Sequence, residues 1–179
     1  LNSQEQELFN RAVASYDLGS IFKIIDLAVM LNVKDDWNEE YFCTGSIKIG
    51  DREFKCYNYE QGGHGYVNLE KAFALSCNTY FINAVINEID IRELLNKARE
   101  FGLGNYTGIS EQGIDEAKGN LPLEKKFFSY GDIANISIGQ GEIMATPIQV
   151  ADIVATIANG GIKNRINIVD SIINENGSK

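Results

Sequence analysis

The chain has 179 residues, of which 44% are hydrophobic, and these values are typical of one globular domain with its own core. Its 16 basic and 25 acidic residues give a net charge of −9, with no strongly basic stretch, which argues against a nucleic-acid partner. The chain shows neither a signal peptide nor an apolar stretch long enough to cross a membrane, so we expect it to be soluble.

Three cysteines and a single histidine restrict the chemistry that the chain can perform. Cys43, Cys56 and Cys77 do not form an even set and do not follow Cys-x-x-Cys spacing, so no metal site is expected. Cys43 and Cys56 could face each other across a hairpin, whereas Cys77 is interpreted as a small buried residue. His64, the only histidine, makes a Ser-His-Asp triad unattractive. It is expected to fix its glycine-rich loop by hydrogen bonds, with ligand binding as the alternative.

The first half of the chain is predicted to form helices and one small β hairpin. A short amphipathic helix is expected at residues 3–14. Residues 21–31 contain only two polar residues, Lys23 and Asp26, so their helix should lie inside the domain. Residues 42–57 alternate moderately between polar and apolar side chains around a tight turn, which predicts a hairpin.

The second half is also predicted to be mainly helical. Residues 110–133 form a long polar connection with few structural signals. Thr146 and Pro147 give a strong helix start, and the nearly continuous apolar pattern after them predicts a second core helix. The expected helices are residues 69–75, 79–88, 91–101 and 147–158, and a strand is expected at residues 167–173.

The start of the central helix carries a possible catalytic pair. Ser20 lies where the helix should begin, and Lys23 follows one turn later on the same face. A buried amine loses solvation, which lowers its pKa, and such a lysine can take a proton from a serine. The structural alternative, a capped core helix, fits this stretch equally well when it is considered alone.

Several further stretches decide between these alternatives. Residues 16–23 (Tyr-Asp-Leu-Gly-Ser-Ile-Phe-Lys) resemble the Tyr-x-Pro-Gly-Ser-Thr-Phe-Lys motif of penicillin-binding proteins, and residues 76–78 (Ser-Cys-Asn) resemble their second motif. The other matching stretches are 63–65 (Gly-His-Gly), 101–104 (Phe-Gly-Leu-Gly), 107–109 (Thr-Gly-Ile), 137–141 (Ser-Ile-Gly-Gln-Gly) and 146–149 (Thr-Pro-Ile-Gln). The chain thus resembles the transpeptidase domain of a high-molecular-mass class B penicillin-binding protein over nearly its whole length.

The resemblance has departures that bear on the fold. Leu18 and Ile21 replace the usual proline and threonine, neither of which does chemistry. The third motif, Lys-Thr-Gly or Lys-Ser-Gly, does not occur. We therefore expect residues 1–179 to be a single partial transpeptidase domain: the mainly helical portion of the β-lactamase/transpeptidase-like α/β fold. The N-terminal strands, the strand carrying Lys-Thr-Gly and most of the five-stranded sheet would be missing.

The resemblance also implies a role for each site residue. Ser20 would attack the D-Ala-D-Ala carbonyl of a peptidoglycan stem peptide and form an acyl-enzyme. Lys23 would accept the serine proton, Ser76 would relay a proton to the leaving amine, and Asn78 would bind the substrate amide. An amine of a neighbouring stem peptide would then take the acyl group, so that no metal or organic cofactor is needed. β-Lactams would acylate the same serine.

Two alternatives to transpeptidation remain open. One is a D,D-carboxypeptidase of the same superfamily, and the other is a non-catalytic relative that binds stem peptides or wall-synthesis proteins. The resemblance implies a parent protein at the extracytoplasmic face of a bacterial membrane. For the 179-residue piece we expect weak or absent acylation and a tendency to self-associate, because loss of the sheet would expose apolar helix faces.

Overall fold

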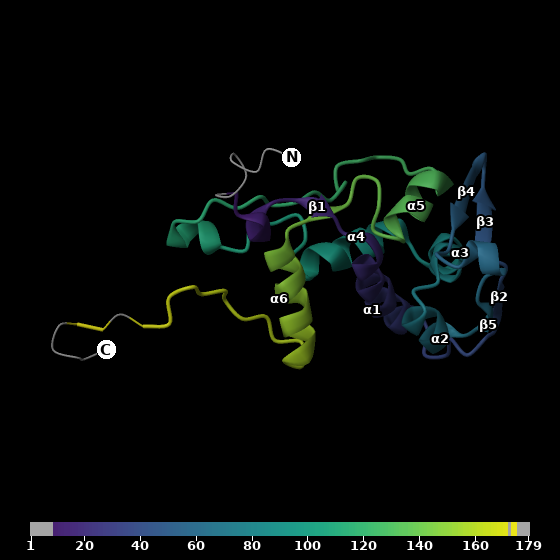
Figure 1. Ribbon diagram of the computed structural model, residues 1–179, viewed down its shortest axis with the longest axis horizontal. Coiled ribbons are helices and arrows are strands. Elements are labelled where there is room, and N and C mark those ends of the chain that lie inside the picture. Colours follow the sequence, from purple (N-terminus) through teal and green to yellow (C-terminus); the bar gives the residue numbers. More distant parts are fainter. Residues whose placement is uncertain (1–8, 172, 175–179) are drawn as a thin grey trace.

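A computed structural model describes residues 9–171 and 173–174 of the chain. Its helices surround a central helix, α1, and three short two-stranded sheets lie around them (Figure 1). The β3–β4 hairpin lies at one end of the longest axis, whereas α6 lies near its middle, on the other side of α1 (Figure 1). None of the helices in the described part of the chain has the length and hydropathy needed to span a membrane.

The bounds of the elements are as follows. The α helices are α1 (Lys23–Val33), α2 (Leu69–Ala74), α3 (Asn78–Glu88), α4 (Ile91–Glu100), α5 (Tyr130–Ile136) and α6 (Pro147–Ala158). The 3-10 helices are η2 (Arg11–Val13), η3 (Gly19–Phe22), η4 (Tyr59–Gln61) and η5 (Ile109–Gln112). The strands are β1 (Tyr16–Asp17), β2 (Tyr41–Cys43), β3 (Ser46–Ile49), β4 (Arg52–Lys55), β5 (Gly65–Val67) and β6 (Met144–Ala145).

Helix α1 is the centre of the core, as its apolar sequence predicts. It packs against α3 and α4, and its Ile25, Val29 and Met30 side chains are fully buried. The opposing core residues are Phe81 and Val85 of α3, Leu94 and Leu95 of α4, and Leu103. Burying a large apolar side chain contributes about 1.5–3 kcal/mol, so this cluster supplies much of the force that holds the start of α1 in place.

The predicted hairpin is present, although it is shorter than expected. Strands β3 and β4 pair antiparallel, with Ile49 opposite Arg52 next to the turn. The expected first half of the hairpin is divided, because β2 pairs instead with β5. Gly45, which has a φ of 96°, separates β2 from β3 and lets the chain change direction there.

The bounds of α6 were predicted correctly, and its burial was not. Thr146 and Gln149 form the expected capping box. Only Gln149, Asp152 and Ile153 of the helix are buried, whereas Val154 and Ile157 are about half exposed. The prediction of a core position for α6 was therefore wrong, because an apolar sequence alone does not show that a helix is covered on all sides.

Three other expectations differ from the structure. The predicted helix at 3–14 lies partly outside the described residues, and its described end contains only η2, capped by Asn10. An unpredicted helix, α5, begins near the end of the predicted polar connection, in a capping box between Ser129 and Asp132, and continues to Ile136. No strand forms in the described part of 167–173: Ile168 donates its backbone N–H to the Gln112 side chain and not to another strand, and the chain after it extends outward (Figure 1).

The loop before α6 supports the start of η3 through a close backbone contact. Gly19 donates its backbone N–H to the Gly139 carbonyl at 2.7 Å. Gly139 has a φ of 67°, and a Cβ at this position would collide with the Gly19 carbonyl oxygen. Gly139 is thus required for two reasons: a side chain would not fit beside Gly19, and the backbone has a positive φ.

We expect Gly139→Ala to be strongly destabilising. Overpacking should cost about 1–3 kcal/mol, in addition to about 1–2 kcal/mol for a left-handed non-glycine residue. Gly160→Ala is a matched control, because Gly160 has the same φ of 67° and no atom lies within 4 Å of the point that its Cβ would occupy. Denaturant unfolding should show a clearly larger loss for Gly139→Ala, and equal losses would contradict the steric argument.

Candidate active site

Four polar residues from separate segments converge at the start of α1. Ser20 lies in η3, and Lys23 is the first residue of α1. Ser76 follows α2 in a left-handed conformation with a φ of 50°, and Asn78 is the first residue of α3. The left-handed residue reverses the chain between α2 and α3, which directs the Ser76 and Asn78 side chains towards α1.

The Lys23 amine is the point at which these side chains meet. Its Nζ lies 2.8 Å from Ser20 Oγ, 3.2 Å from Ser76 Oγ and 2.7 Å from Asn78 Oδ1. Asn78 Oδ1 can only accept a hydrogen bond, whereas each serine hydroxyl can also donate. A neutral Lys23 can therefore donate to Asn78 and receive a proton from either serine.

Burial makes the neutral form of Lys23 more accessible. Lys23 is 1% exposed, although the neighbouring Ser20 is exposed to solvent. Desolvation lowers the pKa of the Lys23 amine, and the charge of Asp26 partly opposes this shift. An exposed serine hydroxyl that is hydrogen-bonded to a desolvated lysine amine is the arrangement that serine activation by a lysine requires.

Asp26, one turn further along α1, is an unusual buried carboxyl group. It is fully buried, and neither of its oxygens has a hydrogen-bond partner in the described part of the chain. Burial raises the pKa of Asp26 well above its usual range, while the charge of Lys23 acts in the opposite direction. The fold thus favours the protonated acid.

This shift predicts how Asp26 affects stability as the pH changes. A raised native pKa gives a contribution that is complete below the unfolded value of about 3.9 and is lost as pH rises through the native pKa. The free energy of unfolding of the wild type, relative to Asp26→Asn, should therefore fall with rising pH, by up to about 1.4 kcal/mol per pH unit. Denaturant titrations of both proteins across this range test the prediction, and a constant or rising difference would contradict it.

The Asn78 amide is held by the β3–β4 hairpin. Its Nδ2 donates to the Lys55 carbonyl at 2.8 Å, at the end of β4. This bond leaves Oδ1 facing Lys23, because the two ends of the amide point in different directions. The hairpin therefore orients one of the partners of the amine.

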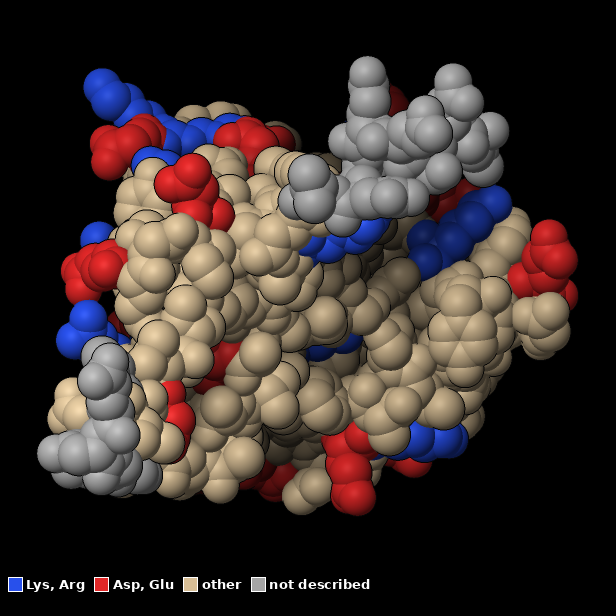
Figure 2. Space-filling model, turned by 60° about the vertical axis from the view of Figure 1, so that its left-hand side comes forward, with Lys and Arg blue, Asp and Glu red and all other residues tan. Residues whose placement is uncertain are grey.

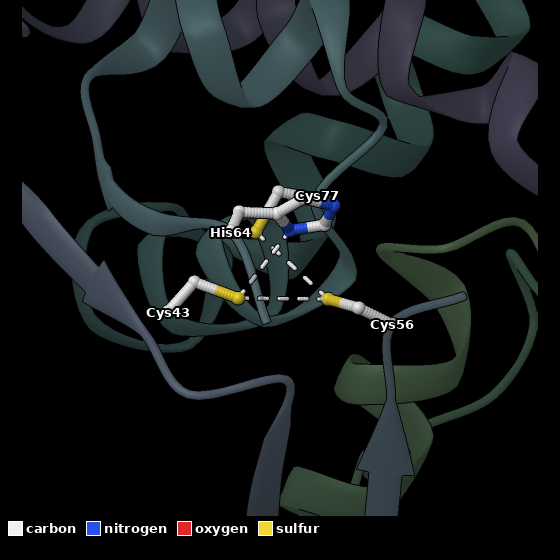
Figure 3. A group of neighbouring side chains, drawn as sticks. All are labelled: Cys43, Cys56, His64 and Cys77. Carbon is white, nitrogen blue, oxygen red and sulfur yellow. Dashed lines mark hydrogen bonds between the residues drawn. The ribbon is translucent and has the colours of Figure 1, made fainter. Parts of the chain in front are cut away.

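A second group of chemically active side chains lies behind the Ser76–Asn78 segment. Among the described residues, Cys43, Cys56, His64 and Cys77 place their potential ligand atoms within 4.8 Å of one another (Figure 3). The three cysteines are buried free thiols. These residues could hold a metal ion, although their long and irregular spacing in the sequence led to the expectation of no metal site.

Charged side chains are not gathered into one basic surface. On the face seen in Figure 2, acidic and basic residues are scattered mainly around the margin, and a hollow near the centre is lined largely by uncharged residues. This distribution is unlike the continuous basic patch of nucleic-acid-binding proteins.

The comparisons with known proteins agree on one family. The profile of the penicillin binding protein transpeptidase domain matches residues 2–179. Among curated relatives, peptidoglycan D,D-transpeptidase MrdA of Acinetobacter baumannii is 32% identical over 88% of this chain and 24% of its own length. Peptidoglycan D,D-transpeptidase PbpA of Mycobacterium tuberculosis is 33% identical over 92% of this chain and 33% of its own length. The chain thus spans about a quarter to a third of these relatives.

Solved structures give the same result. The ceftriaxone acyl-enzyme complex of penicillin-binding protein A from M. tuberculosis superposes with a TM-score of 0.80 at 29% identity, covering 96% of this chain and 38% of that one. The complex of penicillin-binding protein PBP2 with MreC from Helicobacter pylori gives 0.74 at 31% identity, covering 88% and 32%. Sequence profile, curated relatives and fold together establish that this chain belongs to the penicillin-binding protein transpeptidase family.

Proposed function

We propose that this protein is a class B peptidoglycan D,D-transpeptidase that works through an acyl-enzyme on Ser20. The observation that carries the proposal is the Lys23 amine, buried and within hydrogen-bond distance of Ser20, Ser76 and Asn78. The names of its relatives supply the reaction: MrdA and PbpA are peptidoglycan D,D-transpeptidases, and penicillin-binding protein A of M. tuberculosis was captured as a ceftriaxone acyl-enzyme.

In the proposed first half-reaction, Ser20 Oγ attacks the carbonyl carbon of the D-Ala-D-Ala bond. Lys23 Nζ takes the hydroxyl proton at a separation of 2.8 Å. The backbone N–H of Ser20 stabilises the developing oxyanion as one of its donors. The C–N bond then breaks, Ser76 passes a proton to the departing D-alanine amine and receives the one held by Lys23, 3.2 Å away, and the substrate acyl group remains on Ser20.

In the second half-reaction, an amine of a neighbouring stem peptide attacks the acyl-enzyme. Its proton passes to the Ser76–Lys23 pair, the new amide forms, and Ser20 regains its hydrogen. Asn78 would bind the substrate amide with its side-chain amide group, whose Oδ1 lies near Lys23 Nζ. A β-lactam would follow only the first half-reaction, because its leaving amine stays attached to the acyl group.

The described chain also supports the proposal that it forms part of a larger domain. Val154 and Ile157 of α6 and Ile21 of η3 are 41–50% exposed, although they are large apolar residues. A pocket between η3 and α6 is lined by Ile21, Pro147 and Val150. We propose that further strands of the transpeptidase domain cover this apolar surface and supply the Lys-Thr-Gly motif, so that the 179-residue piece by itself acylates poorly and self-associates.

The partners and location follow from the proposed reaction. The substrate would be peptidoglycan at the extracytoplasmic face of a bacterial membrane. Wall-synthesis proteins are candidate partners because one structural relative was solved with MreC and another in a peptidoglycan synthase complex.

Product analysis tests the reaction type. Protein that carries the whole transpeptidase domain should convert a pentapeptide donor and an amine acceptor to a crosslinked product, detected by mass spectrometry. Release of D-alanine with only a hydrolysed tetrapeptide would identify a carboxypeptidase. Absence of both products from folded protein would favour a non-catalytic binding role.

A further inference from the structure

A small pocket with an aromatic floor and an acidic rim lies beyond the end of α1 that is far from Ser20. It has a volume of about 180 Å³, and its main lining residues are Trp37, Tyr41, Tyr80, Glu39, Glu40 and Glu88. Trp37 and Tyr80 are only 8% and 5% exposed, whereas the three glutamates are exposed. A second pocket of about 200 Å³ shares Trp37 with the first and adds Asp35 and Glu70. We call the first of these the acidic–aromatic pocket.

The negative charge of this pocket is not neutralised within the described part of the chain. Glu39, Glu40 and Glu88 form no ion pair with a described residue. The C-terminal ends of α1 and α3, at Val33 and Glu88, add partial negative charge, and neither helix has a basic residue in its last turn. Lys34 is the one basic residue among those that line the pocket. The pocket is therefore electrostatically suited to a cation.

The aromatic floor favours an organic cation with a flat face. Lys34 Nζ lies 4.2 Å from the centre of the Trp37 ring, which is a cation–π contact. The Trp37 ring is held in place, because its Nε1 donates to the Met30 carbonyl at 2.8 Å. Tyr41 and Tyr80 pack edge to face with their ring centroids 5.9 Å apart. A guanidinium stacks on such rings and is more weakly hydrated than an ammonium ion, so arginine suits this floor better than lysine.

Tyr80 points to a ligand independently of the carboxylates. Its side chain lines the pocket, and its hydroxyl has no hydrogen-bond partner among the described residues. Burial and, secondly, the charge of Glu39 raise the pKa of Tyr80 to about 12, which places the hydroxyl near the glutamate side of the pocket. Buried hydroxyl groups usually have a partner. A guanidinium N–H that entered the pocket would donate to this oxygen.

Two other kinds of ligand fit this pocket less well. Small-molecule and cofactor sites usually have volumes of about 300–1,000 Å³. The volume of about 180 Å³ is therefore better matched to one side chain than to a cofactor. A metal ion needs converging ligand atoms, and among the described residues only the cysteine–histidine group brings three or more such atoms close together.

We propose that the acidic–aromatic pocket is a docking site for an arginine in an exposed basic segment of a partner protein. The guanidinium would lie against the aromatic floor, pair with Glu39 and Glu88, and donate to the Tyr80 hydroxyl oxygen. Neighbouring basic residues of the segment would reach Asp35 and Glu70 in the adjoining pocket.

This docking site is separate from the candidate active site. Helix α1 has 11 residues, so the pocket lies about 16 Å from the end of the helix that carries Lys23. A partner bound there would leave the substrate cleft open. The proposal concerns a protein interface and does not depend on the reaction assigned to Ser20.

Direct binding tests the site in protein that carries the whole transpeptidase domain. The probe is a fluorescent peptide of alternating arginine and glycine, whose anisotropy is followed against protein concentration at low salt. The same peptide with citrulline in place of arginine keeps the shape and loses the charge, and it should bind at least about tenfold more weakly. A lysine version should also bind more weakly than the arginine peptide. The readout is binding, so the result is independent of acylation.

Variants with equal changes of charge separate the pocket from general surface charge. Glu39→Gln/Glu88→Gln should weaken binding of the arginine peptide by about tenfold or more. Glu60→Gln/Glu124→Gln is the matched control, because both residues are exposed and lie outside the two pockets. The control should bind like the wild type.

A single hydroxyl provides the most specific variant. Tyr80→Phe removes only the unpartnered hydroxyl, so the protein should keep its melting temperature and bind the arginine peptide about tenfold more weakly. Tyr130→Phe, at an exposed position in α5, should bind like the wild type. Equal binding of the arginine peptide and either of the other two peptides, equal losses in the two glutamate variants, or unchanged affinity in Tyr80→Phe would each overturn the proposal. Failure of the folded wild type to bind the arginine peptide would overturn it as well.

Discussion

Replacing Ser20 with alanine should abolish covalent labelling by penicillin without unfolding the domain. Ser20 Oγ is the exposed partner of the buried Lys23 amine, and its removal deletes the atom that would form the ester. The change leaves the apolar contacts of α1 in place, so stability should change little. Labelled penicillin and denaturing gel electrophoresis, applied to protein with the whole transpeptidase domain, measure the adduct.

Ser110→Ala is a suitable control for this experiment, because Ser110 is exposed in η5 and outside the four-residue site. It should label at the wild-type rate. Persistent labelling of Ser20→Ala would place the nucleophile elsewhere, and this result would remove the basis of the proposed mechanism.

Replacing Lys23 with methionine should slow acylation strongly while leaving the nucleophile in place. Loss of the general base should reduce the rate by about 10²–10⁴-fold. Burial of an apolar thioether in place of a desolvated amine should leave the domain as stable as the wild type or more stable. Stopped-flow acylation kinetics with a chromogenic β-lactam provide the rates, and circular dichroism provides the stability.

The pH dependence distinguishes a base from a residue that only fills space. Desolvation lowers the pKa of Lys23, and the neutral amine is the active form. The wild-type rate should therefore rise with pH until the lowered pKa of Lys23 is passed, whereas Lys23→Met should lack this rise. Lys126→Met is an exposed control and should keep both the rate and the profile. A Lys23→Met rate close to that of the wild type would exclude the base role.

The local part of the site could be predicted from sequence because it depends on local geometry. Ser20 and Lys23 are one helical turn apart, and this spacing brings them together in any helix that begins here. Ser76 and Asn78 join them over more than 50 residues of chain, at 3.2 and 2.7 Å from Lys23 Nζ. Only their resemblance to a known motif suggested that proximity, since no periodicity in the sequence encodes it.

The remaining features depend on tertiary contacts. Cys43, Cys56, His64 and Cys77 have none of the short spacings typical of metal motifs, and they meet only because β2 pairs with β5 instead of continuing into β3. A search for Cys-x-x-Cys patterns could not find them. For α6 the sequence predicted too much burial, because a run of apolar residues does not specify which surface covers them.

Peptide mapping after β-lactam acylation would locate the nucleophile itself. Trypsin cleaves after Arg11 and Lys23, so Ser20 is released in the peptide 12–23. Mass spectrometry of penicillin-treated protein with the whole transpeptidase domain should find one drug adduct in this peptide, and fragmentation should place it on Ser20. An adduct on Ser15, Ser76 or any other residue, or an unmodified peptide 12–23 in folded protein, would contradict the proposed acyl-enzyme.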